Sequence, residues 1–105
     1  MPSPNLTQLQ ERFDAVVTRL LPQLRLTKVV DEQSLAALSS VLDGLREVLG
    51  QEPMVPRKLT GELWFVFAAM LTEADHTSDE EKKEAILTAA WNIQEQLLSI
   101  FGPKF

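Results

Sequence analysis

The sequence contains no cysteine and no tyrosine, and it has a single histidine, His76. The lack of cysteine excludes a disulfide framework, a thiolate nucleophile and a cysteine-ligated metal or iron–sulfur cluster. Neither a Gly-rich phosphate loop nor a dinucleotide fingerprint occurs, and no serine has the surroundings of a nucleophile elbow. We therefore expect a protein that is not an enzyme and that holds no cofactor.

Long hydrophobic runs and an excess of positive charge are also missing. The longest near-apolar run, residues 63–71, is shorter than the roughly 20 residues that span a bilayer. The net charge of −5 disfavours nucleic acid and anionic membrane surfaces, because both attract clustered Lys and Arg. No positively charged start followed by an apolar run occurs at the N-terminus, so we expect no secretory signal and a cytoplasmic location.

The remaining composition is typical of one small globular domain. The chain has 105 residues, of which 45% are hydrophobic and 24% are charged. Apolar residues recur at three- and four-residue steps in four segments, which is the helical period. The sequence therefore predicts a single all-α domain over 1–105, an antiparallel four-helix bundle of up-down-up-down order with helices at about 5–24, 31–49, 60–75 and 78–101.

Several residues indicate where these helices begin. Asn5 with Gln8 has the spacing of a capping box, and Asp31 precedes the second apolar pattern as an N-cap. Thr60 is the expected cap of the third helix, although that helix could begin earlier, near Pro56. For the fourth helix, Thr77 with Glu80 and Ser78 with Glu81 each have the spacing of a capping box.

Two residues indicate where helices end. Pro22 lacks a backbone N–H and clashes with the preceding turn, so the first helix is expected to kink there or end within residues 21–25. Gly50 follows the second apolar pattern and is expected to adopt the left-handed conformation that terminates many helices. Gly44 lies inside the second helix, where it either permits close approach of another helix or is simply exposed.

The last two helices carry more apolar surface than a four-helix monomer needs. The apolar arc of the fourth helix is about 200° wide, against about 140° for each of the first two helices. An antiparallel hairpin about residues 76–78 places Trp64 level with Trp91 and Phe67 level with Leu87. The excess must be covered by loops, by the N-terminal segment or by another chain. We predict a protein interface formed by Phe65, Leu87, Trp91 and Leu98, most simply in a symmetric homodimer.

An acidic turn over residues 73–84 is the alternative site. Asp75, His76 and Asp79 are candidates for binding a divalent cation, because hard cations take carboxylate oxygens. Helix capping and favourable interaction with the helix dipole explain the same carboxylates without a ligand. The spacing matches neither an EF-hand nor a paired metal-binding helix motif, so we expect no metal site there.

The sequence thus favours a small acidic protein-interaction module that self-associates through its third and fourth helices. Two alternatives stay open. One is a toxin-neutralising, immunity-type or other inhibitor protein, a class with similar composition. The other is a helical bundle that binds a metal or a small ligand through the acidic turn at 73–84, or through a cavity walled by Trp64 and Trp91.

Overall fold

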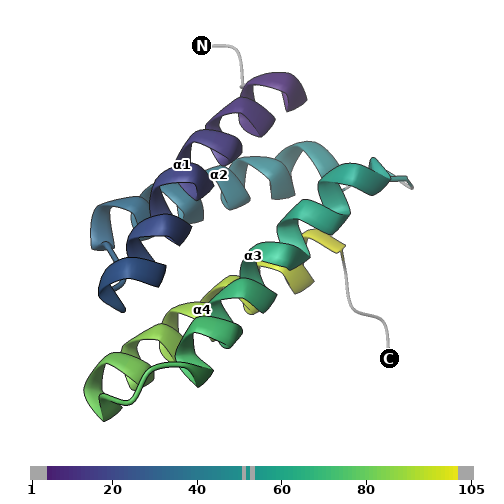
Figure 1. Ribbon diagram of the computed structural model, residues 1–105. Helices are drawn as coiled ribbons and strands as arrows, with labels where there is room; N and C mark the ends of the chain where they lie inside the picture. The colour runs from purple at the N-terminus through teal and green to yellow at the C-terminus, as the bar shows by residue number, and fades with distance from the viewer. Residues whose placement is uncertain (1–4, 51, 53, 102–105) are drawn as a thin grey trace.

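The structure is a computed structural model that describes residues 5–50, 52 and 54–101 (Figure 1). Within these residues it contains four α-helices and no strand, so the predicted all-α helical bundle is confirmed. The helices are α1 (Leu6–Thr27), α2 (Glu32–Leu49), α3 (Arg57–Asp75) and α4 (Glu80–Phe101).

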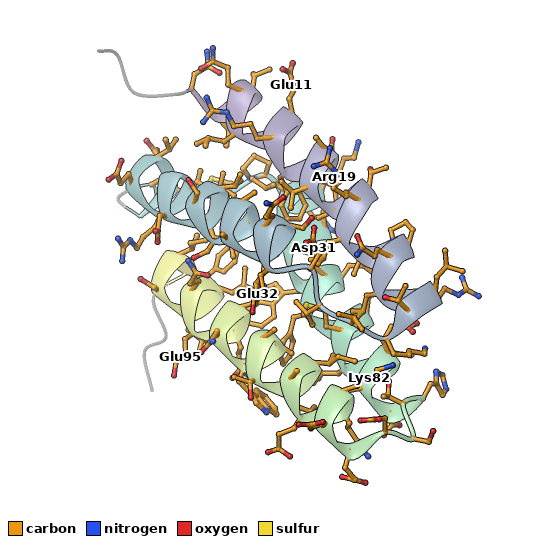
Figure 2. The ribbon with its side chains drawn as sticks, turned by 90° about the vertical axis from the view of Figure 1, so that its left-hand side faces the viewer. Glu11, Arg19, Asp31, Glu32, Lys82 and Glu95 are labelled. Atoms are coloured by element: carbon orange, nitrogen blue, oxygen red, sulfur yellow. The ribbon has the colours of Figure 1, made fainter. Side chains whose placement is uncertain are left out.

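The four helices form two antiparallel hairpins that pack on each other (Figure 1). α1 pairs with α2 and α3 pairs with α4, while α1 also contacts α3 and α2 also contacts α4. Figure 2 shows α2 and α4 side by side and pointing the same way. Among the described helices, α2 does not contact α3, so these two consecutive helices lie at opposite corners of the bundle. The up-down order is as expected, but consecutive helices are not all neighbours.

A single hydrophobic core lies between the hairpins. Its fully enclosed side chains come from all four helices and include Leu20, Leu45, Leu59, Met70 and Leu97. Every buried side-chain nitrogen or oxygen of the described residues has a hydrogen-bond partner. None of the four helices combines the length and apolar character that a bilayer crossing requires.

The predicted caps of the first two helices are confirmed. Asn5 Oδ1 accepts from the Gln8 backbone N–H at 2.9 Å, and Gln8 Oε1 accepts from the Asn5 N–H at 3.1 Å. Asp31 lies where the chain enters α2 (Figure 2). Its Oδ2 accepts from the Ser34 hydroxyl at 2.6 Å and from the Ser34 backbone N–H at 3.3 Å. The pKa of Asp31 is lowered, mainly by the hydrogen bond from the Ser34 hydroxyl. Hydrogen bonds from backbone N–H groups and the positive charge of Arg19 lower it further.

The predicted end of α1 is wrong, because the helix continues through Pro22 to Thr27. Pro22 is exposed, while Leu20 and Leu24 on either side of it are fully buried. The packing of these two leucines outweighs the loss of one backbone hydrogen bond at the surface. The helix ends instead at Lys28, whose left-handed backbone, at φ 58°, lets its N–H donate to the Leu24 carbonyl at 2.8 Å.

Three other helix boundaries differ from the main predictions. α3 begins at Arg57, the earlier of the two predicted starts, and Thr60 lies in its first turn rather than capping it. Asp79 Oδ1 accepts from the Lys82 N–H at 3.0 Å, so Asp79 caps α4 in place of Thr77 or Ser78. Thr77 is buried and donates to the Glu73 carbonyl at 2.6 Å. Gly50 keeps a right-handed backbone at φ −60° and not the expected left-handed one.

Candidate interaction surfaces

A row of aromatic rings covers the outer side of the α3–α4 hairpin. The Trp64 ring stacks on the Phe101 ring with centroids 6.2 Å apart, and it meets the Phe67 ring edge-on at 6.1 Å. The Phe67 ring contacts the Trp91 ring at 5.6 Å. The two tryptophans are therefore joined through Phe67. Such ring contacts contribute about 0.5–1.5 kcal/mol each beyond the area they bury.

The pairing of these rings corrects the predicted register of the hairpin. Trp64 was expected level with Trp91, and Phe67 level with Leu87. In the structure Phe67 contacts Trp91, and Trp64 contacts Phe101. Helical side chains lean toward the N-terminus of their own helix. Those of α3 therefore lean away from the turn and those of α4 toward it, so each α3 ring meets a residue further along α4.

Three predicted interface residues belong to this side of α4. Trp91 is 48% exposed, and Leu87 and Leu98 are half-buried. Leu98 lies seven residues beyond Trp91 and therefore on the same side of the helix. Leu87 lines a shallow hollow with Leu71 of α3. We use the name aromatic face for the surface formed by Trp64, Phe67, Leu87, Trp91, Leu98 and Phe101.

Phe65, the fourth predicted interface residue, lies elsewhere. It is 61% exposed and packs toward α1, on the other side of α3 from Phe67. It lines two hollows between α1 and α3. The first hollow, of about 330 Å³, is bounded by residues 13–17 and 57–66. The second hollow, of about 540 Å³, is bounded by residues 21–26 and by Ala69. We call the two hollows together the α1–α3 groove.

Sequence reasoning missed several parts of these two surfaces. Leu26, which is 83% exposed, was assigned to a connector because Pro22 was expected to end the helix. It is in fact the last apolar residue of α1 and lines the second hollow. Phe101 was not among the predicted interface residues, because its contact with Trp64 depends on the register of the hairpin. The direction in which helical side chains lean was the signal that predicts this register.

A partly buried ion pair fixes the end of α1 against α3. Lys28 Nζ lies 2.5 Å from Glu73 Oε2, and the side chains of Lys28 and Glu73 are 28% and 15% exposed. The left-handed backbone of Lys28 directs the chain out of the helix at the same point. This contact therefore fastens the C-terminal end of α1 to α3.

The acidic turn spreads its candidate ligands over a helix cap and exposed positions. Asp79 caps α4, while His76 ends α3 through its backbone, and both side chains are exposed. In the part of the chain that the structure describes, no three His, Asp or Glu side chains gather closely enough to hold a metal ion. A wide hollow of about 640 Å³ near the start of α4 is lined by Glu81 and Glu84, but also by Lys28 and Lys82. Its charges are therefore mixed.

The candidate site thus consists of two separate apolar surfaces, the aromatic face and the α1–α3 groove. Comparison with known proteins adds no assignment to either surface: no family, curated protein or solved structure matches this chain.

Proposed function

We propose that this chain is a small, acidic, non-enzymatic protein-interaction module that self-associates by pairing two copies of the aromatic face. The observation that carries this proposal is the exposure of Trp91, which is 48% exposed at one end of a continuous row of rings. Tryptophan is among the residues that contribute most to protein interfaces, because burying its large rigid ring costs little conformational entropy.

The charge of the aromatic face favours a second copy as its partner. The chain carries a net charge of −5, so two copies repel each other unless they meet at a neutral surface. All six side chains of the aromatic face are uncharged, but two exposed carboxylates, Glu84 and Glu95, flank Trp91 on α4, so a pairing of the faces must keep them at its rim. The face is also elongated along the hairpin, and a two-fold axis through it would place each row of rings on its counterpart.

The size of the face is adequate for a dimer. A helix rises about 1.5 Å per residue and neighbouring helices pack about 8–10 Å apart, so the outer side of the hairpin measures roughly 30 Å by 20 Å. Its geometric area is on the order of 600 Å². A standard interface buries about 800 Å² of accessible surface per partner, which a textured face of this extent approaches.

Light scattering coupled to size-exclusion chromatography tests the proposal. The wild-type chain, of 11.8 kDa, is expected to elute with twice that mass. Trp91→Glu places a charge in the paired face and should give a monomer, and Leu98→Lys should do the same. Phe65→Glu is the matched control, since it adds the same charge to an exposed aromatic position outside the face.

Circular dichroism of each variant shows whether its helices are retained. The proposal fails if the wild-type chain remains a monomer up to about 1 mM, because weaker association corresponds to less than about 4 kcal/mol. It also fails if both Trp91→Glu and Leu98→Lys fold and remain dimers.

A further inference from the structure

We infer that the α1–α3 groove is a second binding surface, and that it takes an acidic amphipathic helix from another protein. The groove is independent of the aromatic face, since Phe65 and Phe67 lie on different sides of α3. This inference therefore does not depend on the proposed dimer.

The shape of the groove suits a helix with two large apolar side chains. Phe65 lines both hollows, and the remaining lining includes the apolar residues Val17, Leu21 and Ala69. On α3 the first hollow lies near Gly61 and the second near Ala69, which places them about 12 Å apart at 1.5 Å per residue. Two side chains seven residues apart on a bound helix span about the same distance. A small residue between them leaves room for the Phe65 ring.

The cations at the two ends of the groove favour an acidic partner. Arg57 and Lys58 border the first hollow, and Arg25 borders the second. Two carboxylates, Asp14 and Glu62, also border the first hollow, and Glu62 pairs loosely with Lys58 at 3.8 Å, so Asp14 is the one carboxylate that remains to offset Arg25 and Arg57. Neither Arg25 nor Arg57 takes part in an ion pair within the described residues. Cations thus lie at both ends of an apolar groove.

The overall negative charge of the chain does not cancel this local preference. At physiological ionic strength, charges separated by more than about 8 Å are largely screened. The guanidinium groups at the ends of the groove would contact a bound helix directly. Carboxylates on that helix would therefore interact mainly with these cations and less with distant acidic residues.

A second copy of this chain does not supply such a helix. Its most acidic helical stretch is the start of α4, where Glu80, Glu81 and Glu84 occur. The apolar residues that follow are Ile86, which is fully buried, and Leu87, which belongs to the aromatic face. The groove therefore points to a different protein as the partner.

The inference can be tested with three labelled synthetic helices of about 16 residues, roughly 24 Å long. All three carry leucine at two positions seven residues apart with alanine between them. They differ only at their ends, which carry glutamate, lysine or glutamine. Fluorescence anisotropy with the full chain is expected to show that the glutamate peptide binds several-fold, and up to about 25-fold, more tightly than the lysine peptide, because two exposed ion pairs contribute up to about fivefold each.

Variants of the chain locate the binding. Phe65→Glu should abolish binding of the glutamate peptide, whereas Trp91→Glu should leave it unchanged. Arg25→Glu with Arg57→Glu should weaken that binding several-fold, and by up to about 25-fold. The matched control is Arg12→Glu with Arg46→Glu, which changes the net charge equally at exposed positions away from the groove, and it should have little effect.

Four outcomes would overturn the inference. The first is that none of the peptides binds up to about 1 mM. The second is that the glutamate and lysine peptides bind equally well. The third is that the control pair of substitutions weakens binding as much as the groove pair. The fourth is that Trp91→Glu, and not Phe65→Glu, removes binding, which would assign the peptide to the aromatic face.

Discussion

The aromatic face and the α1–α3 groove each expose one large aromatic residue, but the surroundings of these residues differ. Trp91 packs on Phe67 within a row of rings, so its exposed side belongs to a continuous apolar surface, which Glu84 and Glu95 border. Phe65 makes no ring contact among the described aromatic residues and separates two hollows with cations at their ends. The first surface suits a flat, self-complementary contact, and the second suits insertion of a partner's side chains.

Helix connectivity explains the difference. α3 and α4 form a hairpin with aromatic side chains on both helices, and these close over the seam between them. α1 and α3 come from different hairpins and meet through smaller residues such as Val17, Gly61 and Ala69. Short side chains leave space between two helices that long aromatic side chains would fill.

The largest expected effect on stability comes from a core substitution, and comparing it with a substitution in the aromatic face separates folding from binding. Leu63 is enclosed in the core, so Leu63→Ala should lower the free energy of unfolding by about 2–5 kcal/mol. Trp91→Ala removes one ring contact at the surface and should cost only about 1 kcal/mol, yet it should weaken the dimer strongly. Urea denaturation followed by circular dichroism, at a concentration where both variants are monomers, measures the two costs. An equal loss in both variants would assign Trp91 to the core.

The ion pair beside the groove should have a smaller effect. Glu73→Gln breaks the partly buried contact with Lys28 and should lower the free energy of unfolding by about 1 kcal/mol. Glu62→Gln is the control, because its pair with Lys58 is longer and exposed, and its effect should be close to zero. The dimer should be unchanged in Glu73→Gln, because neither residue of the pair belongs to the aromatic face. A larger loss of stability in Glu62→Gln would contradict this comparison.

Two helical glycines, Gly44 in α2 and Gly61 in α3, allow a matched test of how closely each helix packs on its neighbours. A Cβ at Gly61 would meet nothing within 4 Å, so Gly61→Ala should stabilise the chain by up to about 1 kcal/mol and slightly narrow the first hollow. A Cβ at Gly44 would lie 2.8 Å from Leu9 Cδ2, which is buried. Gly44→Ala should therefore stabilise the chain less than Gly61→Ala does, or destabilise it. The melting temperatures of both variants measure this difference. A larger stabilisation by Gly44→Ala than by Gly61→Ala would contradict the close approach of Leu9 to Gly44.

Asp31 should produce the smallest effect, seen only in acid. Its pKa in the folded chain lies below the ordinary value of 3.8, chiefly because the Ser34 hydroxyl donates to the carboxylate. The stabilisation is therefore fully present above about pH 4 and is lost as the pH falls through the lowered pKa. Asp31→Asn should flatten the dependence of stability on pH in this range. If stability depends on pH in the same way in Asp31→Asn as in the wild-type chain, the Asp31 carboxylate does not stabilise the fold through its charge.

Much of the fold follows from local sequence signals. Periodic apolar residues predicted four helices, and the caps at Asn5 and Asp31 were identified from residue type and spacing alone. Pro22 misled the prediction because tertiary packing of Leu20 and Leu24 decides whether α1 continues. Asp79 was not among the predicted caps of α4, yet it caps that helix, while Thr77 is drawn into a contact with Glu73.

The candidate site was only partly predictable for a related reason. Helical spacing correctly grouped Leu87, Trp91 and Leu98 on one side of α4. It gave no information about which helix lies beside Phe65, because that depends on how the two hairpins stack. The sequence therefore identified exposed apolar residues, and only the packing of α1 against α3 divided them into two surfaces.

The central claim is that these two surfaces act independently, and the mass of the peptide complex tests it most directly. Light scattering with the glutamate peptide should give a wild-type dimer with two peptides bound. The Trp91→Glu variant should be a monomer with one peptide, and the Phe65→Glu variant should be a dimer with none. A single substitution that removes both dimerisation and peptide binding from a folded chain would contradict the account.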